Sequence, residues 1–307
     1  MKIVRATFLG IRGVSDGTYD FTHPTTGAPN SLVLVTGPEA SGKTSFLEAI
    51  VAAKEAIGAY GPMSPGATWI ASGGVIAKVM LSFALDDEER HYVGTSESVV
   101  DGEATFLPER VRRDADEGLV ALLARYEHGV KCGKMEYFPS SRRILPLGPF
   151  HGTGVVEQRM QRASKEITKY GFIVRFLREL NQLPAAQKAF AEHIARLSPT
   201  CRYVPSEPNS GLPRCFATRG IAGATMSELS ETEQHCIIFA ATAVAIGLSK
   251  SLILIDRPEA SASPSRAGAF LEALSMLGDD NQIIMASFSN EILAAVPRTN
   301  IIRLEGT

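Results

Sequence analysis

A chain of 307 residues is long enough for one large domain or two small ones, with a sizeable buried core. Its hydrophobic (45%) and charged (21%) shares are ordinary for a globular protein, and a formal net charge of −2 excludes any overall attraction to nucleic acid or membranes. No apolar stretch is long enough to span a bilayer and no signal peptide opens the sequence, so we expect a cytoplasmic protein that does not bind membranes.

The first part of the chain alternates short apolar runs with turns. Residues 1–21 predict a hairpin or meander, and residues 22–30, rich in Pro, Gly and Thr, predict a loop. After a break at residues 61–66, two further strands are predicted over 77–85 and 90–95, with a turn between them.

Between these strands lies the most informative stretch. Leu32–Val35 predicts a buried strand, a glycine-rich loop follows at once, and a helix then runs to about Tyr60. Gly37-x4-Gly42-Lys43-Thr44 has the spacing of a phosphate-binding loop in its required context of strand, loop and helix. Its glycines let backbone N–H groups approach phosphate oxygens, and the start of the helix adds positive partial charge. The candidate nucleotide-binding residues are Gly37, Pro38, Glu39, Ala40, Ser41, Gly42, Lys43, Thr44 and Ser45.

The middle of the chain carries no phosphate chemistry. We expect a helix over 114–127, a strand and then a loop over 136–147, a flexible segment at 148–154, and helices over 155–181 and 184–197. The polar side of the first long helix carries Arg159, Arg162, Lys165 and Lys169. These could hold a nucleic-acid backbone, but interspersed glutamates favour a solvated face.

The last third alternates helices and apolar strands. Residues 198–224 predict a loop, and Met226–His235 opens a long apolar helix that continues over Cys236–Leu248. Buried strands are expected at Ser251–Asp256 and Gln282–Ala286. Helices at 266–277 and 290–295 and a last strand at 300–304 complete the pattern. The four cysteines, Cys132, Cys201, Cys215 and Cys236, form no Cys-x-x-Cys pair, so neither a zinc site nor a disulfide framework is indicated.

Three motifs together resemble the ABC-type ATPases. They are the phosphate-binding loop, Leu229-Ser-Glu-Thr-Glu-Gln234, and Asp256-Arg-Pro-Glu-Ala-Ser-Ala-Ser-Pro264. The closer likeness is to the structural-maintenance-of-chromosomes, RecF-like and OLD-like heads. It covers residues 1–100 and 215–307, and it implies an α/β ABC-ATPase fold with a mixed sheet and an amino-terminal antiparallel β meander. Residues 101–214 would be a mainly helical insertion, with only a faint match at Phe138-Pro-Ser-Ser-Arg142.

The resemblance also implies roles for residues. In such heads two copies sandwich two ATP molecules, so Lys43 and Thr44 would hold phosphate, and Thr44 and Asp256 would hold Mg²⁺. Ser230 and Glu233 would stand where the family places contacts to the partner head, with Ser230 on the partner's γ-phosphate. Residues 260–264 would cross the interface. We therefore expect ATP and Mg²⁺ as cofactors, and a homodimer or a heteromer with a related head.

Four positions depart from the family pattern on the γ-phosphate side. Arg257 replaces the glutamate that orients the attacking water, and Phe288 replaces a histidine after the next strand. Thr232 replaces the glycine of the signature, and Ser263 replaces the histidine of the interface loop. A guanidinium has no acceptor and stays protonated, so it cannot act as the base. The pattern indicates that hydrolysis is lost or moved to a partner.

Three hypotheses follow. The first is an ATP-stabilised, hydrolysis-deficient regulatory or scaffolding subunit, with other subunits bound through 101–214 and a setting in DNA maintenance or anti-phage defence by analogy. The second is an active ATPase that uses another base, with Glu259 first. The third is a structural subunit without nucleotide. Nucleic-acid binding stays open, and His235 is expected on a helix surface.

Overall fold

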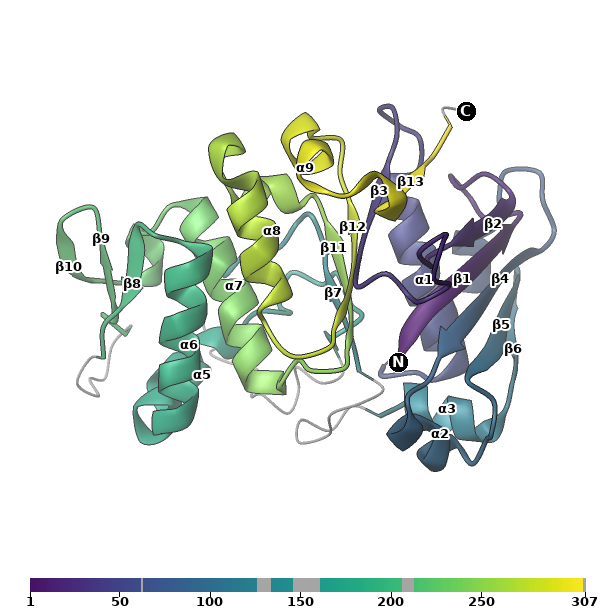
Figure 1. Cartoon of the computed structure of the whole chain (residues 1–307), viewed down its shortest axis with the longest axis horizontal. Helices are drawn as coiled ribbons and strands as arrows, with labels where there is room; N and C mark the ends of the chain where they lie inside the picture. The colour runs from purple at the N-terminus through teal and green to yellow at the C-terminus, as the bar shows by residue number, and fades with distance from the viewer. Residues whose placement is uncertain (62, 126–133, 146–160, 206–212, 306–307) are drawn as a thin grey trace.

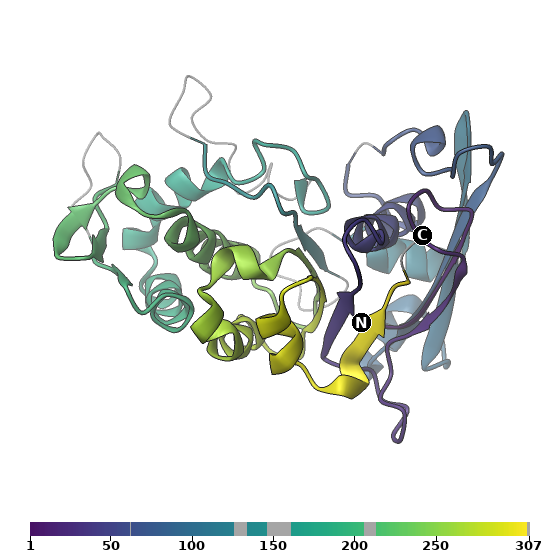
Figure 2. The same ribbon diagram turned by 90° about the horizontal axis from the view of Figure 1, so that it is seen from above.

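The computed structural model describes residues 1–61, 63–125, 134–145, 161–205 and 213–305, and it shows a layered α/β molecule (Figure 1). An antiparallel sheet forms one end. Helix α1 (Lys43–Ile57) lies between it and a central parallel sheet. Helices α7 (Glu231–Ile246) and α8 (Ala267–Ser275) cover the other face of the central sheet, and the view from above shows the same order of layers (Figure 2). In the described part of the chain, no helix is both long and apolar enough to cross a membrane.

The central sheet is entirely parallel. Its order is β13-β3-β12-β11-β7, that is Ile301–Arg303, Leu32–Thr36, Gln282–Ala286, Leu252–Asp256 and Met135–Phe138. Every residue of β7, β11 and β12 is buried. Such unbroken burial is the rule for parallel strands covered on both faces. The strands expected at Leu32–Val35, Ser251–Asp256, Gln282–Ala286 and 300–304 are confirmed.

Alternate residues of these strands enter two different hydrophobic cores. Ile253 and Ile255 pack with α7 and α8, whereas Leu252 and Leu254 pack with α1 and the antiparallel sheet. The split follows from the two-residue period of a strand. Helix α1 is buried on most of its sides because it is enclosed between two sheets.

The antiparallel sheet has the order β2-β1-β4-β5-β6. Its strands are Gly17–Asp20, Lys2–Leu9, Ala77–Ala84, Val99–Leu107 and Arg110–Ala115. The amino-terminal meander expected from the sequence is therefore present. The sheet also continues past residue 100, because β5 and β6 pair with each other and β5 pairs with β4. Strand β7 in the central sheet confirms the strand expected at the start of residues 136–147, and it too lies in the segment expected to be mainly helical.

The strand predicted over 90–95 is wrong, because α2 (Asp87–Val93) occupies that stretch. Asp86 accepts a hydrogen bond from the Glu89 backbone N–H, and the Glu89 side chain accepts one from the Asp86 N–H. This reciprocal cap stabilises a helix start, and Gly94 ends the helix in the left-handed conformation. The helix predicted over 114–127 is shorter, namely α3 (Glu117–Leu123).

The far end of the molecule is built from the later part of the chain. Helices α5 (Phe172–Glu179) and α6 (Pro184–Leu197) pack on α7, and α9 (Asn290–Ala295) lies beside α8. The loop predicted over 198–224 contains a three-stranded sheet in the order β10-β9-β8, that is Ile221–Ala224, Phe216–Thr218 and Cys201–Tyr203. These strands are only three or four residues long, which is too short for an alternating pattern to stand out.

The basic residues of this segment were expected on one solvated helix face, and the structure does not place them there. Arg162 and Lys169 are fully buried, and the Lys169 ammonium lies 2.8 Å from the buried Glu136 carboxylate. Lys165 pairs instead with Glu48 of α1. A pattern of charges cannot show that a loop folds them inward beside β7. Arg159, Cys132 and residues 148–154 lie outside the described residues.

Candidate nucleotide-binding site

The loop between β3 and α1 is shaped so that only glycine fits at two positions. Gly42 has φ of 85°, in the left-handed region, and a Cβ there would lie 1.6 Å from the Gly13 carbonyl oxygen. A Cβ on Gly37 would lie 2.6 Å from the Leu304 carbonyl oxygen. The loop is thus held between the turn at Gly13 and the residue that follows β13, with no room for a Cβ at either glycine.

Lys43 folds over this loop. Its Nζ donates to the Gly37 carbonyl (3.1 Å), the Pro38 carbonyl (2.5 Å) and the Ser41 hydroxyl (3.3 Å). The ammonium therefore lies among the backbone oxygens at the loop's centre, in front of the first turn of α1. Glu39 and Ala40 are exposed, Ser41 is buried and Ser45 is half-buried.

Thr44 and Asp256 meet although 212 positions separate them. The Thr44 hydroxyl lies 3.1 and 3.0 Å from the two carboxylate oxygens of Asp256. Burial raises the pKa of the Asp256 carboxyl, and hydrogen bonds from Thr44 and Ser140 oppose that rise. A hydroxyl and a carboxylate are hard oxygen donors, which suit Mg²⁺ completed by phosphate and water. No group of three or more His, Cys, Asp or Glu residues that could hold a metal occurs among the described residues.

Arg142 braces the backbone beyond Asp256, and sequence reasoning missed it. Its guanidinium is buried and donates to the carbonyls of Asp256 (2.7 Å) and Arg257 (2.8 Å) and to the Ser261 hydroxyl (2.6 Å). The only signal was the faint match that ends at this residue. An arginine fork suits such work because its N–H groups are fixed in one plane.

His235 is buried, not on the helix surface as expected. Its Nε2 lies 3.0 Å from the Arg142 carbonyl oxygen, and its Nδ1 lies 3.3 Å from the Ser261 hydroxyl and 3.2 Å from the Ala260 carbonyl. Burial, and next the charge of Arg142, lower the pKa of His235 to about 4. The neutral ring can donate from Nε2 and accept from Ser261 at Nδ1, so α7 is tied to the segment after Asp256.

Arg257 and Phe288, which the resemblance places at positions that are catalytic in the family, contact each other. Arg257 has φ of 52°, in the left-handed region, and its guanidinium carbon lies 5.3 Å from the centre of the exposed Phe288 ring. The expected alternative base, Glu259, accepts a hydrogen bond from the Ser287 hydroxyl (2.7 Å). These residues follow two different strands in the sequence. They meet because β11 and β12 pair in parallel and end side by side.

The signature residues lie elsewhere. Ser230 caps α7, and its hydroxyl lies 2.8 Å from the Glu233 carboxylate, which is itself buried and also bonded to Thr200 and Thr218. Glu233 therefore serves the cap within the chain, and Thr232 is exposed. Helix α7 covers the opposite face of the central sheet from α1 (Figures 1 and 2). The structure thus brings Gly37–Ser45 and Asp256 together, without the signature.

Arg12 directly precedes Gly13, whose carbonyl packs against Gly42. It is exposed in the turn whose Gly13 touches Gly42, and its backbone N–H is held by the Trp69 carbonyl (2.8 Å).

Comparison with solved structures identifies the fold. An Smc head bound to the C-winged helix domain of ScpA has a TM-score of 0.63 at 16% identity, over 99% of this chain and 94% of that chain. A Pyrococcus furiosus Smc head with an extended coiled coil, bound to the C-terminal domain of ScpA, has 0.61 at 14%, over 98% and 93%. The recombination mediator RecF–ATPrS has 0.52 at 10%, over 98% and 97%. No protein-family model and no curated protein matches the sequence. The fold is therefore that of SMC and RecF heads, as the resemblance implied.

Proposed function

We propose that this chain is an ABC-type head that binds Mg²⁺-ATP and serves as an ATP-stabilised regulatory or scaffolding subunit. The observation that carries the proposal is the contact between Thr44 and Asp256, because it joins the phosphate-binding loop to the carboxylate that follows β11. The glycine-lined loop and the oxygen donors fit a phosphate and Mg²⁺. Bound Mg²⁺ would neutralise phosphate charge. Gly37–Ser45 would bind the phosphates, Lys43 would reach the terminal ones, and Thr44 and Asp256 would hold the metal.

Isothermal titration tests nucleotide binding. Wild type should bind ATP in the presence of Mg²⁺ and lose most of that affinity with EDTA. Lys43→Ala should abolish binding, whereas Lys188→Ala, on the exposed surface of α6, should not. If wild type does not bind ATP at millimolar concentration, the hypothesis that remains is a structural subunit that uses no nucleotide.

We further propose that hydrolysis is deficient. Positioning of the attacking water supplies much of phosphoryl-transfer catalysis. Arg257 offers no acceptor for the proton of that water. Phe288 has no hydrogen-bonding group. Turnover should therefore be at least ~100-fold below a typical enzyme rate of ~10 s⁻¹.

Release of labelled phosphate measures this rate. Arg257→Glu alone should restore little, and the triple change with Phe288→His and Thr232→Gly is the fair rescue. Turnover of several per second that disappears in Lys43→Ala would instead favour an active ATPase, with Glu259→Gln as the next variant.

Protein partners are the last part of the proposal. We infer pairing with a second copy or a related head, and contacts to other subunits through the surface of residues 101–214. Ile167, Leu183 and Val204 support this, because these large apolar side chains are 44–52% exposed. The neighbouring Smc heads are bound to ScpA, which is a precedent for a head that holds another subunit. A role in DNA maintenance or defence rests on analogy alone, and nucleic-acid binding gains no support from the buried Arg162 and Lys169.

Affinity purification from the native source tests these contacts. The double variant Leu183→Asp/Val204→Asp should lose proteins that wild type retains, while keeping its ATP affinity. If the double variant retains the same proteins as wild type, the partner surface lies outside this segment.

A further inference from the structure

The stacked pair at the ends of β11 and β12 has one fixed part and one movable part. The Arg257 backbone is fixed, since its N–H donates to the Ala286 carbonyl (2.9 Å) and its own carbonyl accepts from Arg142. The side chain is exposed, and the Phe288 ring is the contact that the structure shows for its guanidinium among the described residues. A backbone held in the left-handed region at a non-glycine residue is a feature that clusters at functional sites.

The position of this fixed backbone matters. Arg257 directly follows Asp256, whose carboxylate contacts Thr44 of the phosphate-binding loop. Ala286, which holds the Arg257 N–H, is paired with Val35 at the end of β3, just before the loop. The Arg257 backbone is therefore anchored one residue from Asp256, a proposed Mg²⁺ ligand, and Mg²⁺ in phosphate-binding-loop proteins bridges the β- and γ-phosphates.

We propose that Arg257 distinguishes nucleoside triphosphate from diphosphate. This inference rests on the proposed nucleotide binding. It assigns Arg257 a role of its own, beyond the absence of the glutamate that the family has at this position. Without a γ-phosphate, the guanidinium stays stacked on Phe288. With one, it turns to the phosphate oxygens and leaves the ring uncovered.

Two physical differences support the direction of this exchange. A cation over an exposed aromatic ring is held weakly, whereas a guanidinium and a phosphate form charge-assisted, often bidentate hydrogen bonds. A nucleoside diphosphate has no γ-phosphate, so it offers no partner that would draw Arg257 from the ring.

Uncovering Phe288 also changes a surface. The ring lines a pocket of about 400 Å³ together with Glu259, Ala262, Pro264 and Ile292. The side chain is already 56% exposed with the guanidinium in place. The triphosphate state would therefore present a different apolar surface from the diphosphate state at the edge of this pocket.

The first experiment measures nucleotide preference. The affinities for ADP and for a non-hydrolysable ATP analogue, each with Mg²⁺, are determined for wild type, Arg257→Gln and Arg257→Lys. Arg257→Gln should lose about tenfold in the preference for the triphosphate, with ADP affinity unchanged. Arg257→Lys should lose part of it, because an ammonium lacks the planar fork. Arg112→Gln, an exposed arginine on β6, is the matched control and should behave as wild type.

The second experiment follows the ring. Trp69 is the only tryptophan, so Trp69→Phe/Phe288→Trp places a single reporter at the stacking position. Iodide should quench this reporter more strongly with the ATP analogue than with ADP or no nucleotide. Adding Arg257→Gln should give strong quenching throughout, with no response to nucleotide. Circular dichroism checks the fold of each variant.

The outcomes separate the two proposals. Binding of both nucleotides with equal preference in wild type and Arg257→Gln would overturn the inference and leave nucleotide binding intact. An unchanged reporter on saturation with the analogue would do the same. Binding of neither nucleotide by wild type would overturn the proposed function itself, and this inference with it.

Discussion

At the scale of residues, the charged and polar groups behind Asp256 form one connected unit. Arg142 holds two successive carbonyls and the Ser261 hydroxyl, and His235 ties that unit to α7. Buried donors and acceptors of this kind are costly to leave without partners. The unit therefore fixes the orientation of the Asp256–Arg257 peptide, on which both the proposed metal ligand and the stacked arginine depend.

His235 should make the protein sensitive to acid. Its folded-state pKa of about 4 lies below the ordinary 6.5, so the unfolded chain binds the proton first. Stability is full above pH 6.5 and falls as the pH drops towards 4. Arg142, the Ser261 hydroxyl and, 3.9 Å away, the exposed Glu231 are the polar and charged groups around the ring.

The measurement is urea unfolding at pH 7 and pH 5. Since one pKa unit corresponds to about 1.4 kcal/mol, wild type should lose roughly 2 kcal/mol more than His235→Gln between these values. The exposed His91→Gln serves as the control and should follow wild type. Equal losses in wild type and His235→Gln would show that this ring does not govern the acid response.

Gly42→Ala tests the shape of the phosphate-binding loop. The new Cβ would meet the Gly13 carbonyl at 1.6 Å in a backbone conformation that alanine rarely adopts, so the loop must move. ATP affinity should fall at least about tenfold by titration calorimetry. Gly268→Ala in α8, where nothing lies within 4 Å of the new atom, should bind ATP as wild type does and be slightly more stable. Normal ATP binding by Gly42→Ala would mean that the loop is not held as described.

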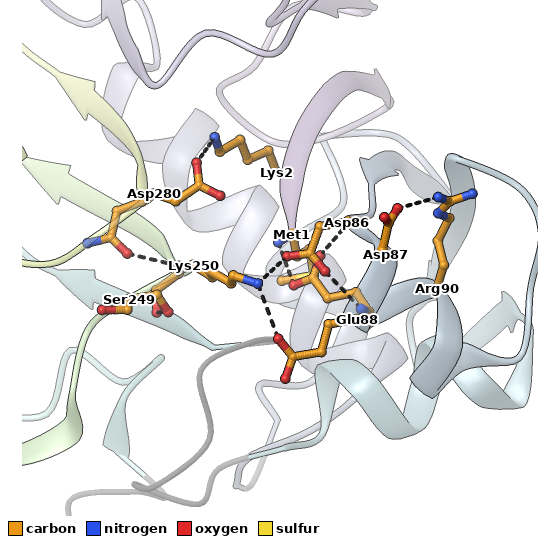
Figure 3. Close-up of polar contacts among 12 residues, drawn as sticks. Met1, Lys2, Asp86, Asp87, Glu88, Arg90, Ser249, Lys250 and Asp280 are labelled. Atoms are coloured by element: carbon orange, nitrogen blue, oxygen red, sulfur yellow. Dashed lines mark hydrogen bonds and ion pairs between the residues drawn. The ribbon is translucent and has the colours of Figure 1, made fainter.

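At the scale of elements, ion pairs join α2 and β1 to the residues that precede β11 and β12 in the central sheet (Figure 3). The Lys250 ammonium lies 2.7 Å from Asp86, the cap of α2, and 3.2 Å from Glu88. The hydrogen bonds that its ammonium donates to these two carboxylates raise the pKa of Lys250. Nearby, Lys2 of β1 pairs with Asp280, which precedes β12. These ion pairs lie at the starting ends of β11 and β12, whereas the proposed nucleotide site lies at their far ends.

Replacing Lys250 by Met should cost about 1 kcal/mol or less at low salt, because partly exposed ion pairs contribute little. Urea unfolding should show that difference shrinking in 1 M NaCl, where charges are screened beyond about 3 Å. Lys188→Met is the control, since the described residues show no ion pair for Lys188, and it should show no salt-dependent difference. A cost that does not change with salt would assign the effect to packing of the aliphatic stem.

At the scale of the whole molecule, two sheets and two cores place the signature of one chain on the other side from its own phosphate-binding loop. That separation agrees with the proposed pairing, in which each loop meets the signature of another copy. Sedimentation with and without the ATP analogue measures it. Wild type should gain mass with nucleotide, and Ser230→Arg should not.

The control is Ser230→Ala, which removes the cap of α7 without adding bulk and should cost about 1 kcal/mol of stability. A stability loss shared by both variants would therefore reflect the cap, and only the change in mass would reflect pairing. Identical mass in wild type with and without nucleotide would exclude ATP-dependent pairing.

Deleting residues 155–197 should unfold the protein. Phe172, Phe190 and Ile194 are fully buried in the core around α7. Each such side chain contributes about 1.5–3 kcal/mol, while a whole domain is stable by only about 5–15 kcal/mol. Circular dichroism melting checks this, and a cooperative wild-type-like transition in the deletion variant would show an independent segment.

The sequence by itself determined the parts that local pattern controls. An apolar strand, a glycine-rich loop and a helix lie within about twenty residues, and the run that ends at Asp256 is equally local. These predicted the buried strands, the phosphate-binding loop and the β meander, whereas the fold was implied by the resemblance that the three motifs carry together. Each depends on residues that are neighbours in the chain, so a short window contains the whole cause.

Only the tertiary structure decided the rest. The burial of His235 and Lys169 depended on partners far away in the sequence. The cap of α2 by Asp86 and Glu89 is local instead, and the strand prediction over 90–95 overlooked it. The contact of Arg257 with Phe288 exists because β11 and β12 pair in parallel and end together. A sequence shows which groups can pair. The packing of distant segments decides which of them are close enough to do so, because hydrogen bonds and ring contacts act only over a few ångströms.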